Sequence, residues 1–194
     1  FFLSGAGGWW FPNIGIVDLN KWSYIVATYN GTAKAIYVNG VKVAEMAQTG
    51  NIVSSTYNLS IGSRQDGTLL FNGIIDSPRL YSRALSADEI LSNYQAGNIE
   101  FQYRVSTDNN TWSNWTSYND GALMFDGTND YVTIPDNNNL DLVSAITIEA
   151  WVNFDNVTTN YQTIVGKRDT SAIEVKYVLR SQANQLSFYY SANS

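Results

Sequence analysis

The sequence predicts an all-β fold, an antiparallel β-sandwich with one short helix. Stretches rich in Val, Ile, Tyr, Phe and Thr alternate with polar residues at a period of two, which is typical of half-buried strands. Asn, Asp and Gly separate these stretches at short intervals, as turns would. With 194 residues the chain can also bury a sizeable core, so it needs no disulfide despite containing no Cys.

The predicted strands run along the whole chain. Asn39-Gly40 is the strongest hairpin signal, because a type I′ turn needs positive φ at both central residues. The strands are expected at residues 10–17, 22–29, 34–38, 41–47, 57–63, 70–81, 99–106, 111–118, 123–126, 131–134, 146–154, 162–167, 174–179 and 186–190. The expected core residues are Trp22, Ile25, Ala27, Ile36, Val38, Ile61, Ile75, Leu80, Phe125, Val132, Ile148 and Trp151.

One helix has a complete start signal. Ser86 and Glu89 fit a capping box, in which each side chain satisfies a backbone N–H of the other. The helix is expected to run from Ala87 to about Gln95, with Gly97 in the left-handed conformation that ends it. Because an isolated helix of this length is marginal in water, it is expected to dock on the sandwich.

Composition excludes several classes of function. The absence of His and Cys removes imidazole bases, thiol nucleophiles and Cys/His zinc sites. A net charge of −6 has the wrong sign for nucleic acid or anionic lipid, so neither is an expected partner. No apolar run approaches the roughly 18 residues that span a bilayer, so we expect no membrane insertion. A polar surface with few charges favours an extracellular or cell-surface location.

Several segments resemble a known family, the concanavalin A-like, laminin G-like jelly rolls. The segments similar to the second half of that domain are residues 22–31 (WSYIVATYNG), 35–44 (AIYVNGVKVA), 59–63 (LSIGS) and 71–90 (FNGIIDSPRLYSRALSADEI). The segments similar to the first half are residues 123–135 (LMFDGTNDYVTIP) and 146–153 (ITIEAWVN). The resemblance implies a jelly-roll sandwich whose halves occur in reversed order, as in repeat units of large microbial surface proteins.

The reversed order divides the chain into three parts. Residues 1–97 resemble the second half of a sandwich, residues 98–121 are a connector with the alternation of a β-hairpin, and residues 122–194 resemble the first half. Three arrangements follow from this order. The chain is a circular permutant that closes on itself, an excerpt from a tandem array, or a subunit whose halves complete domains in neighbouring copies.

The apolar ends favour assembly with other copies. Residues 1–3 and 186–190 are unlike free tails, and an open apolar sheet edge seeks another chain. We therefore expect strands near residues 1–17 and 174–192 to lie side by side and to come from different copies or successive repeats. This predicts head-to-tail strand complementation into a surface filament or tandem array.

Carboxylates and metals are the next candidates for chemistry. Glu149 and Glu174 stand alone in their strands, whereas retaining glycosidases pair two carboxyl groups about 5 Å apart, so no catalytic residue and no enzyme activity are expected. The resemblance implies a Ca²⁺ site, for which Asp126 and Asp130 supply hard oxygen ligands. It also implies that the first and last strands are neighbours, which would bring Asp76 to the same site. The alternative is that these residues only form turns.

Aromatic side chains and sequons are the remaining candidate sites. Trp10, Trp112 and Trp115 are expected to contact glycans if exposed, and the alternative is that they pack in the core. N-glycosylation sequons begin at Asn30, Asn58, Asn109, Asn114 and Asn156. The sequence thus predicts a non-catalytic extracellular structural or adhesive unit. The alternative is a carbohydrate-binding accessory module of a secreted multidomain protein.

Overall fold

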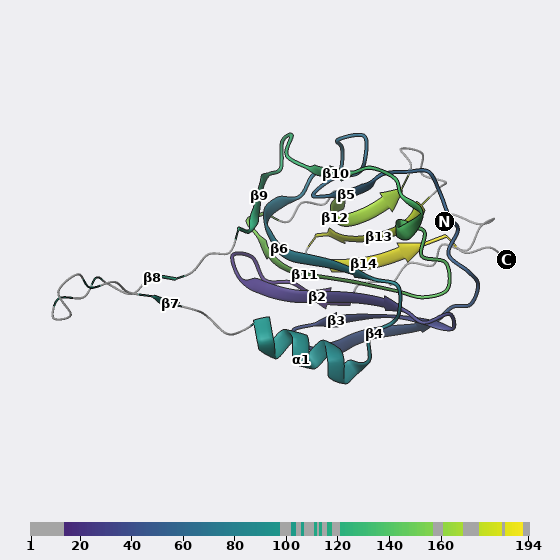
Figure 1. Ribbon diagram of the computed structural model, residues 1–194, viewed down its shortest axis with the longest axis horizontal. Coiled ribbons are helices and arrows are strands. Elements are labelled where there is room, and N and C mark those ends of the chain that lie inside the picture. Colours follow the sequence, from purple (N-terminus) through teal and green to yellow (C-terminus); the bar gives the residue numbers. More distant parts are fainter. Residues whose placement is uncertain are drawn as a thin grey trace.

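The fold was analysed in a computed structural model of the chain. It describes residues 14–97, 102–103, 106, 111, 113, 116–117, 121–156, 161–168, 175–183 and 185–191. Two six-stranded sheets pack face to face in this part of the chain, and all their ladders are antiparallel (Figure 1). The expected all-β sandwich is therefore confirmed.

The two sheets are named A and B. Sheet A contains, in spatial order, β1 (Ile14–Ile16), β14 (Gln185–Tyr190), β13 (Val175–Gln182), β12 (Tyr161–Arg168), β5 (Leu59–Ile61) and β10 (Val132–Ile134). Sheet B contains β4 (Val41–Ala47), β3 (Ala33–Val38), β2 (Trp22–Tyr29), β11 (Ile146–Phe154), β6 (Asn72–Tyr81) and β9 (Leu123–Asp126). A separate pair is formed by β7 (Gln102–Tyr103) and β8 (Thr116–Ser117), and a short 3₁₀ helix, η1, spans Asn138–Leu140.

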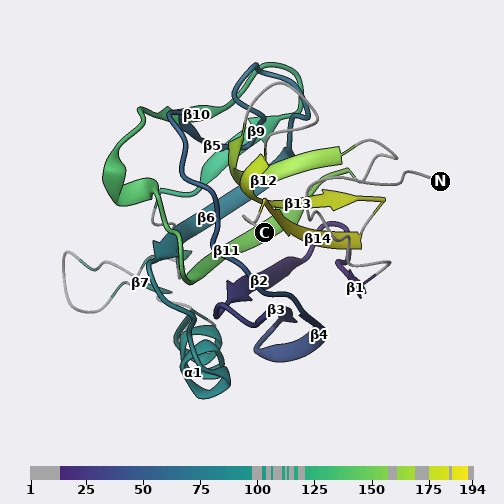
Figure 2. The ribbon, with the colours of Figure 1, turned by 90° about the vertical axis from the view of Figure 1, so that its right-hand side faces the viewer.

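Helix α1 (Ala87–Gly97) lies on the outer face of sheet B (Figure 2). Its capping box is confirmed, since the Ser86 backbone N–H donates to Glu89 and the Glu89 backbone N–H donates to Ser86 Oγ at 3.2 Å. The expected left-handed Gly97 is wrong. Gly97 is the last helical residue, without positive φ, and a Cβ there would lie 2.3 Å from Trp151 Nε1. The glycine is needed for this close approach rather than for a turn.

The β3–β4 hairpin turns as its dipeptide predicts. Asn39 and Gly40 have φ of 52° and 78°, the positive values that a type I′ turn needs. The Asn39 backbone N–H also donates to the Tyr24 carbonyl, and the Tyr24 N–H donates to Asn39 Oδ1 at 2.9 Å. The turn therefore ties the hairpin back to β2.

The core lies between the sheets and contains most of the expected residues. Ile25, Ala27, Ile36, Ile61, Ile75, Phe125 and Ile148 are buried in it, and Val38, Leu80 and Val132 are partly buried against it. The prediction that Trp22 is buried is wrong, because this residue is 44% exposed on the outer face of sheet B. Trp151 also points outwards, into a second cluster beneath α1. Both residues have the opposite parity to the buried residues of their own strands, Ile25 and Ile148, so alternation itself puts them on the outer face.

The two halves of the chain interleave within one sandwich. Strand β11 lies between β2 and β6, and β5 lies between β12 and β10. Six of the ten ladders in the two sheets join a strand before the connector to a strand after it. Strands β1 and β14 are neighbours, as expected, and they pair within the chain.

Candidate functional site

The outer face of sheet B is divided by helix α1. Under the helix lies a closed cluster that includes Tyr24, Val26 and Tyr37 from the sheet and Ile90 from α1. Beyond the end of the helix, the same face carries exposed Trp22 and Met124. We call these the covered half and the open half of the outer face.

A buried carboxylate organises the covered half. Glu149 on β11 is 1% exposed. Its Oε2 accepts hydrogen bonds from Tyr24 Oη at 2.5 Å and Asn93 Nδ2 at 3.2 Å, and its Oε1 accepts from Tyr81 Oη at 3.0 Å. The Arg79 guanidinium completes an ion pair with Oε1 at 3.1 Å. Burial, together with this carboxylate, raises the pKa of Tyr24 and Tyr81, so both stay protonated donors.

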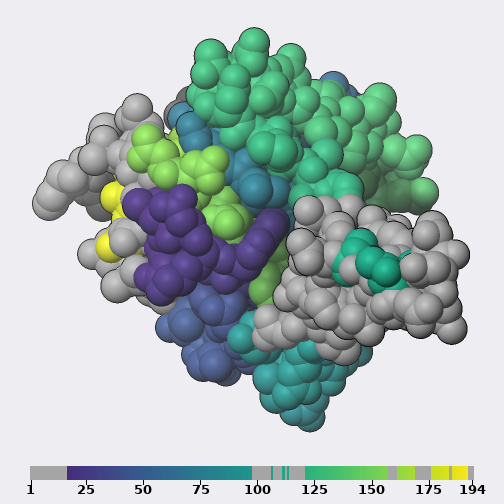
Figure 3. Space-filling view, turned by 90° about the vertical axis from the view of Figure 1, so that its left-hand side faces the viewer, coloured from purple at the N-terminus to yellow at the C-terminus, as the bar shows by residue number. Residues whose placement is uncertain are grey.

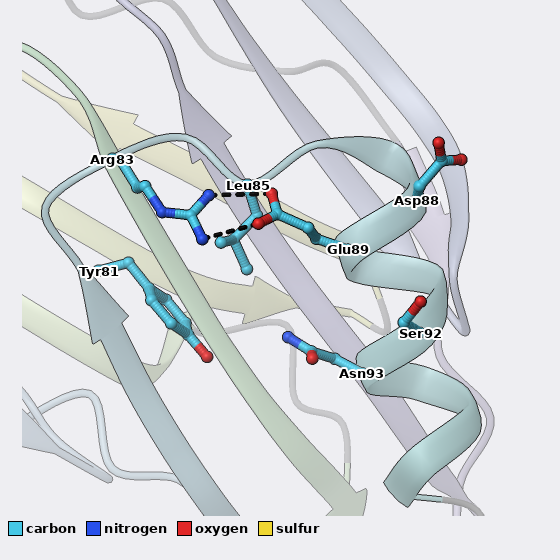
Figure 4. Close-up of a pocket in the computed structure, with 7 residues that line it drawn as sticks. All are labelled: Tyr81, Arg83, Leu85, Asp88, Glu89, Ser92 and Asn93. Atoms are coloured by element: carbon cyan, nitrogen blue, oxygen red, sulfur yellow. Dashed lines mark hydrogen bonds and ion pairs between the residues drawn. The ribbon is translucent and has the colours of Figure 1, made fainter.

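A first hollow of about 330 Å³ lies between α1 and the end of β6 (Figure 4). Two of its polar groups, Tyr81 and Asn93, already donate to Glu149. Another two, Arg83 and Glu89, form a bidentate ion pair, in which the two guanidinium nitrogens lie 2.7 and 2.9 Å from the carboxylate oxygens. This ion pair lowers the pKa of Glu89 to about 2. The principal polar groups of this hollow hold the helix on the sheet, so we assign it a structural role.

A second hollow, of about 410 Å³, lies at the end of the sandwich from which α1 leads into the connector (Figure 3). We call it the rim hollow. The β5–β6 loop, the β9–β10 turn and the start of β12 surround it. Its lining residues are Leu69, Leu70, Asn72, Asp126, Gly127, Thr128, Asn156, Tyr161 and Gln162.

Local folding positions the polar groups of the rim hollow. Asp126 Oδ1 accepts from the Thr128 N–H at 2.7 Å, which shapes the β9–β10 turn. Asn72 Nδ2 donates to the Asp126 carbonyl at 2.9 Å, and Gln162 Nε2 donates to the Asn156 carbonyl at 3.2 Å. Asp126, Thr128 and Asn156 are exposed residues that line the hollow. A carboxylate, a hydroxyl and an amide beside a tyrosine ring can bind the hydroxyls of a small polar ligand.

The three carboxylates predicted for calcium do not come together. Strands β6 and β9 are neighbours, as expected, but their register places Asn72 opposite Asp126. Asp76 is four residues further along β6, about 13 Å away, and it pairs with Trp151. Asp130 Oδ2 accepts from the Asp126 N–H at 3.1 Å, so this carboxylate also serves the turn. Among the residues that the structure describes, no three His, Cys, Asp or Glu side chains form a metal-binding group. The proposed set therefore does not fit a calcium ion.

The other predicted site residues divide into two groups. Trp10, Trp112, Trp115, Asn109 and Asn114 lie outside the described residues, as does Glu174. The remaining sequon residues are Asn30, Asn58 and Asn156. Asn30 is exposed and its Oδ1 accepts from Thr32 and Ala33, Asn58 Oδ1 accepts from the Asp136 N–H, and Asn156 is exposed in the rim hollow.

Buried lysines are a feature that the sequence analysis missed. Lys167 forms ion pairs with Asp136 and Asp141, which hold the loop around η1 against sheet A. Lys34 is fully buried on the inner side of β3, where its Nζ donates to the Phe188 carbonyl at 3.4 Å. Burial lowers the pKa of Lys34 to about 8.

The comparisons with known proteins now give the family. Residues 2–91 and 126–194 match the concanavalin A-like lectin/glucanases superfamily, and these segments make up most of the chain. The chain belongs to this superfamily. Each matched segment of the superfamily domain contributes strands to both sheets, and the connector lies between the two segments. No curated protein and no solved structure shows a significant match.

Two further findings bear on the sequence-based predictions. In the described part of the chain, no helix is long and apolar enough to cross a membrane. Asn72, Thr128 and Tyr161 line the rim hollow, and the sequence did not identify any of them as a candidate site residue. Only the Asp-Gly and Asn-Asp pairs of the β9–β10 turn marked this place in the sequence, and they were assigned to calcium.

Proposed function

We propose that this chain is a non-catalytic, extracellular adhesive module that binds a glycan in the rim hollow. The observation that carries the proposal is the group of exposed polar residues Asp126, Thr128 and Asn156 beside the ring of Tyr161, one face of which carries the Arg180 guanidinium 3.8 Å from its centroid. Saccharides present hydroxyls and apolar ring faces together, and this combination of side chains can contact both. Membership of a lectin-containing superfamily supports the same conclusion.

The absence of catalysis is part of the proposal. Glu149 is buried and accepts hydrogen bonds from four side chains, which suits a structural carboxylate rather than a general acid. Asp126 lies at the rim with its Oδ1 bonded to the backbone of its own turn. Such an arrangement supports binding without bond cleavage.

A glycan array tests this function. We expect reproducible binding of the intact chain to a subset of glycans. Asp126→Asn keeps the acceptor for the Thr128 N–H but removes the charge, and Tyr161→Ala removes the ring, so both should abolish the signal. Glu45→Gln, on the exposed edge strand β4, is the matched control and should bind normally. Binding that survives both rim variants would refute the site.

Assembly with other copies is a second candidate function. The interleaving of the two halves supports it, because the six ladders that join them could also be made between the halves of two copies. The reversed order of the halves and the head-to-tail filament stay predictions. Light scattering across a wide concentration range tests these predictions. Strand exchange between copies should give a series of oligomers of increasing mass, whereas a constant monomer mass at every concentration would refute the assembly.

A further inference from the structure

A row of outward-facing side chains crosses sheet B next to the rim hollow. The ladder register places Trp22 opposite Asn153, Asn153 opposite Ile74, and Ile74 opposite Met124. Met124 is 77% exposed and Trp22 is 44% exposed, and the two residues between them are partly exposed. We call these four residues the cross-strand row.

The cross-strand row and the rim hollow form one continuous surface. Asn72 and Asp126 are an opposed pair two residues along β6 and β9 from Ile74 and Met124. Because side chains two apart in a strand share a face, these polar residues stand beside the row. The row extends over three strand spacings, about 14 Å, from β9 to β2. The combined surface is longer than one sugar ring.

The chemistry of this surface changes along its length. At the hollow, Asp126, Thr128 and Asn156 present polar atoms, whereas the row presents apolar side chains and ends at an indole ring. Of the residues that line the hollow, Asp126 alone is charged. None of the four residues of the row is charged. A negative chain with this lining repels acidic sugars. An uncharged sugar can form hydrogen bonds through its hydroxyls at the hollow and stack its ring faces on the apolar side chains of the row.

We infer that the site takes an uncharged oligosaccharide several rings long, with one terminal ring in the rim hollow and the following rings along the cross-strand row. Trp22 stacks on the ring furthest from the hollow. This inference rests on the proposed function, because it extends the same site. It differs from that function in two respects, since it specifies the length of the ligand and its lack of charge.

Calorimetric titration with uncharged gluco-, galacto- and manno-oligosaccharides of increasing length tests the inference. For the series that binds, affinity should rise with each added ring until the row is covered and then level off. Trp22→Ala should weaken the longer oligosaccharides about tenfold and leave the monosaccharide unchanged. Val41→Ala removes an exposed apolar side chain from the far edge strand β4, and it should change neither.

The outcomes separate the inference from the proposed function. Equal affinity for short and long members, or unchanged affinities in Trp22→Ala, would overturn the extended site while leaving the hollow in place. Tighter binding of oligogalacturonates than of the uncharged galactose series would overturn the assignment of an uncharged ligand. If no saccharide binds at any length, the proposed function fails and this inference fails with it.

Discussion

The covered and open halves of sheet B carry similar side chains in different surroundings. Tyr24 and Trp151 lie in adjacent strands beneath α1, with ring centroids 5.3 Å apart, and Tyr94 of the helix stacks on both. Trp22 is the next outward-facing residue of β2 after Tyr24. It is 44% exposed, and no helix among the described residues covers it. The position of a single helix therefore decides whether an aromatic ring on this face stabilises the fold or faces solvent.

The difference predicts two kinds of mutational effect. A residue beneath the helix is fixed by packing and hydrogen bonds, so truncating it should lower the free energy of unfolding. A residue in the open half has few contacts to lose, so truncating it should change ligand binding with little change in stability. The following variants test this division, from the largest expected effect to the smallest.

Glu149→Ala should destabilise the chain most, by about 4 kcal/mol. The variant leaves the Tyr24 hydroxyl and the Asn93 amide without their buried acceptor, and it loosens the helix from the sheet. Urea unfolding at pH 7 measures the change. Glu45→Ala, whose exposed pair with Lys42 contributes little, is the control. Equal stabilities of the two variants would show that the covered half is not held by Glu149.

Lys34→Met should stabilise the chain by about 3 kcal/mol at pH 7, because a buried amine whose pKa falls from 10.5 to about 8 is costly to keep protonated. The folded pKa lies below the unfolded one. The native state of the wild type therefore gains stability as pH rises from about 8 to 10.5, and the advantage of the variant shrinks over the same window. Unfolding curves at pH 7 and above pH 10.5 measure both values. An advantage that is constant with pH would contradict a buried charge as its cause.

Trp22→Ala should change the free energy of unfolding by less than about 1 kcal/mol, since the side chain is only partly covered. Tyr24→Ala, one outward position further along β2 and beneath α1, should cost several times more because its ring and hydroxyl are both buried. Thermal unfolding of the two variants side by side makes the comparison. A similar loss in both would mean that the open half also belongs to the folded core.

Calcium should have the smallest effect. Because Asp76 lies away from Asp126 and Asp130, calcium well above the millimolar dissociation constants of weak extracellular sites should leave Tm unchanged. Thermal unfolding of metal-stripped protein, with and without calcium, tests this. A rise in Tm that Asp130→Ala removes would show that the β9–β10 turn binds the ion after all.

Local signals in the sequence predicted local structure well. The capping box at Ser86 and Glu89 and the turn at Asn39-Gly40 each depend on neighbouring residues, and both formed as expected. The sandwich itself followed from alternation and from the resemblance. These features need no knowledge of which strands become neighbours.

The site depended on pairings between distant strands, which alternation cannot supply. Trp22 was assigned to the core together with Ile25 and Ala27, although alternation along β2 puts it on the opposite face from them. Asp76 was placed near Asp126 because neighbouring strands were foreseen but their register was not. Glu149 appeared isolated, although residues 125, 70, 68 and 56 positions away in the sequence converge on its carboxylate.

The most direct test of the account follows the indole N–H resonances during titration with the best-binding uncharged oligosaccharide. The Trp22→Ala spectrum identifies the signal of Trp22, and the Trp151→Phe spectrum identifies the signal of Trp151. The account predicts that the Trp22 signal moves and saturates with the ligand, while the Trp151 signal, beneath the helix, stays in place. A stationary Trp22 signal under saturating ligand would contradict the assignment of the open half of sheet B as the binding surface.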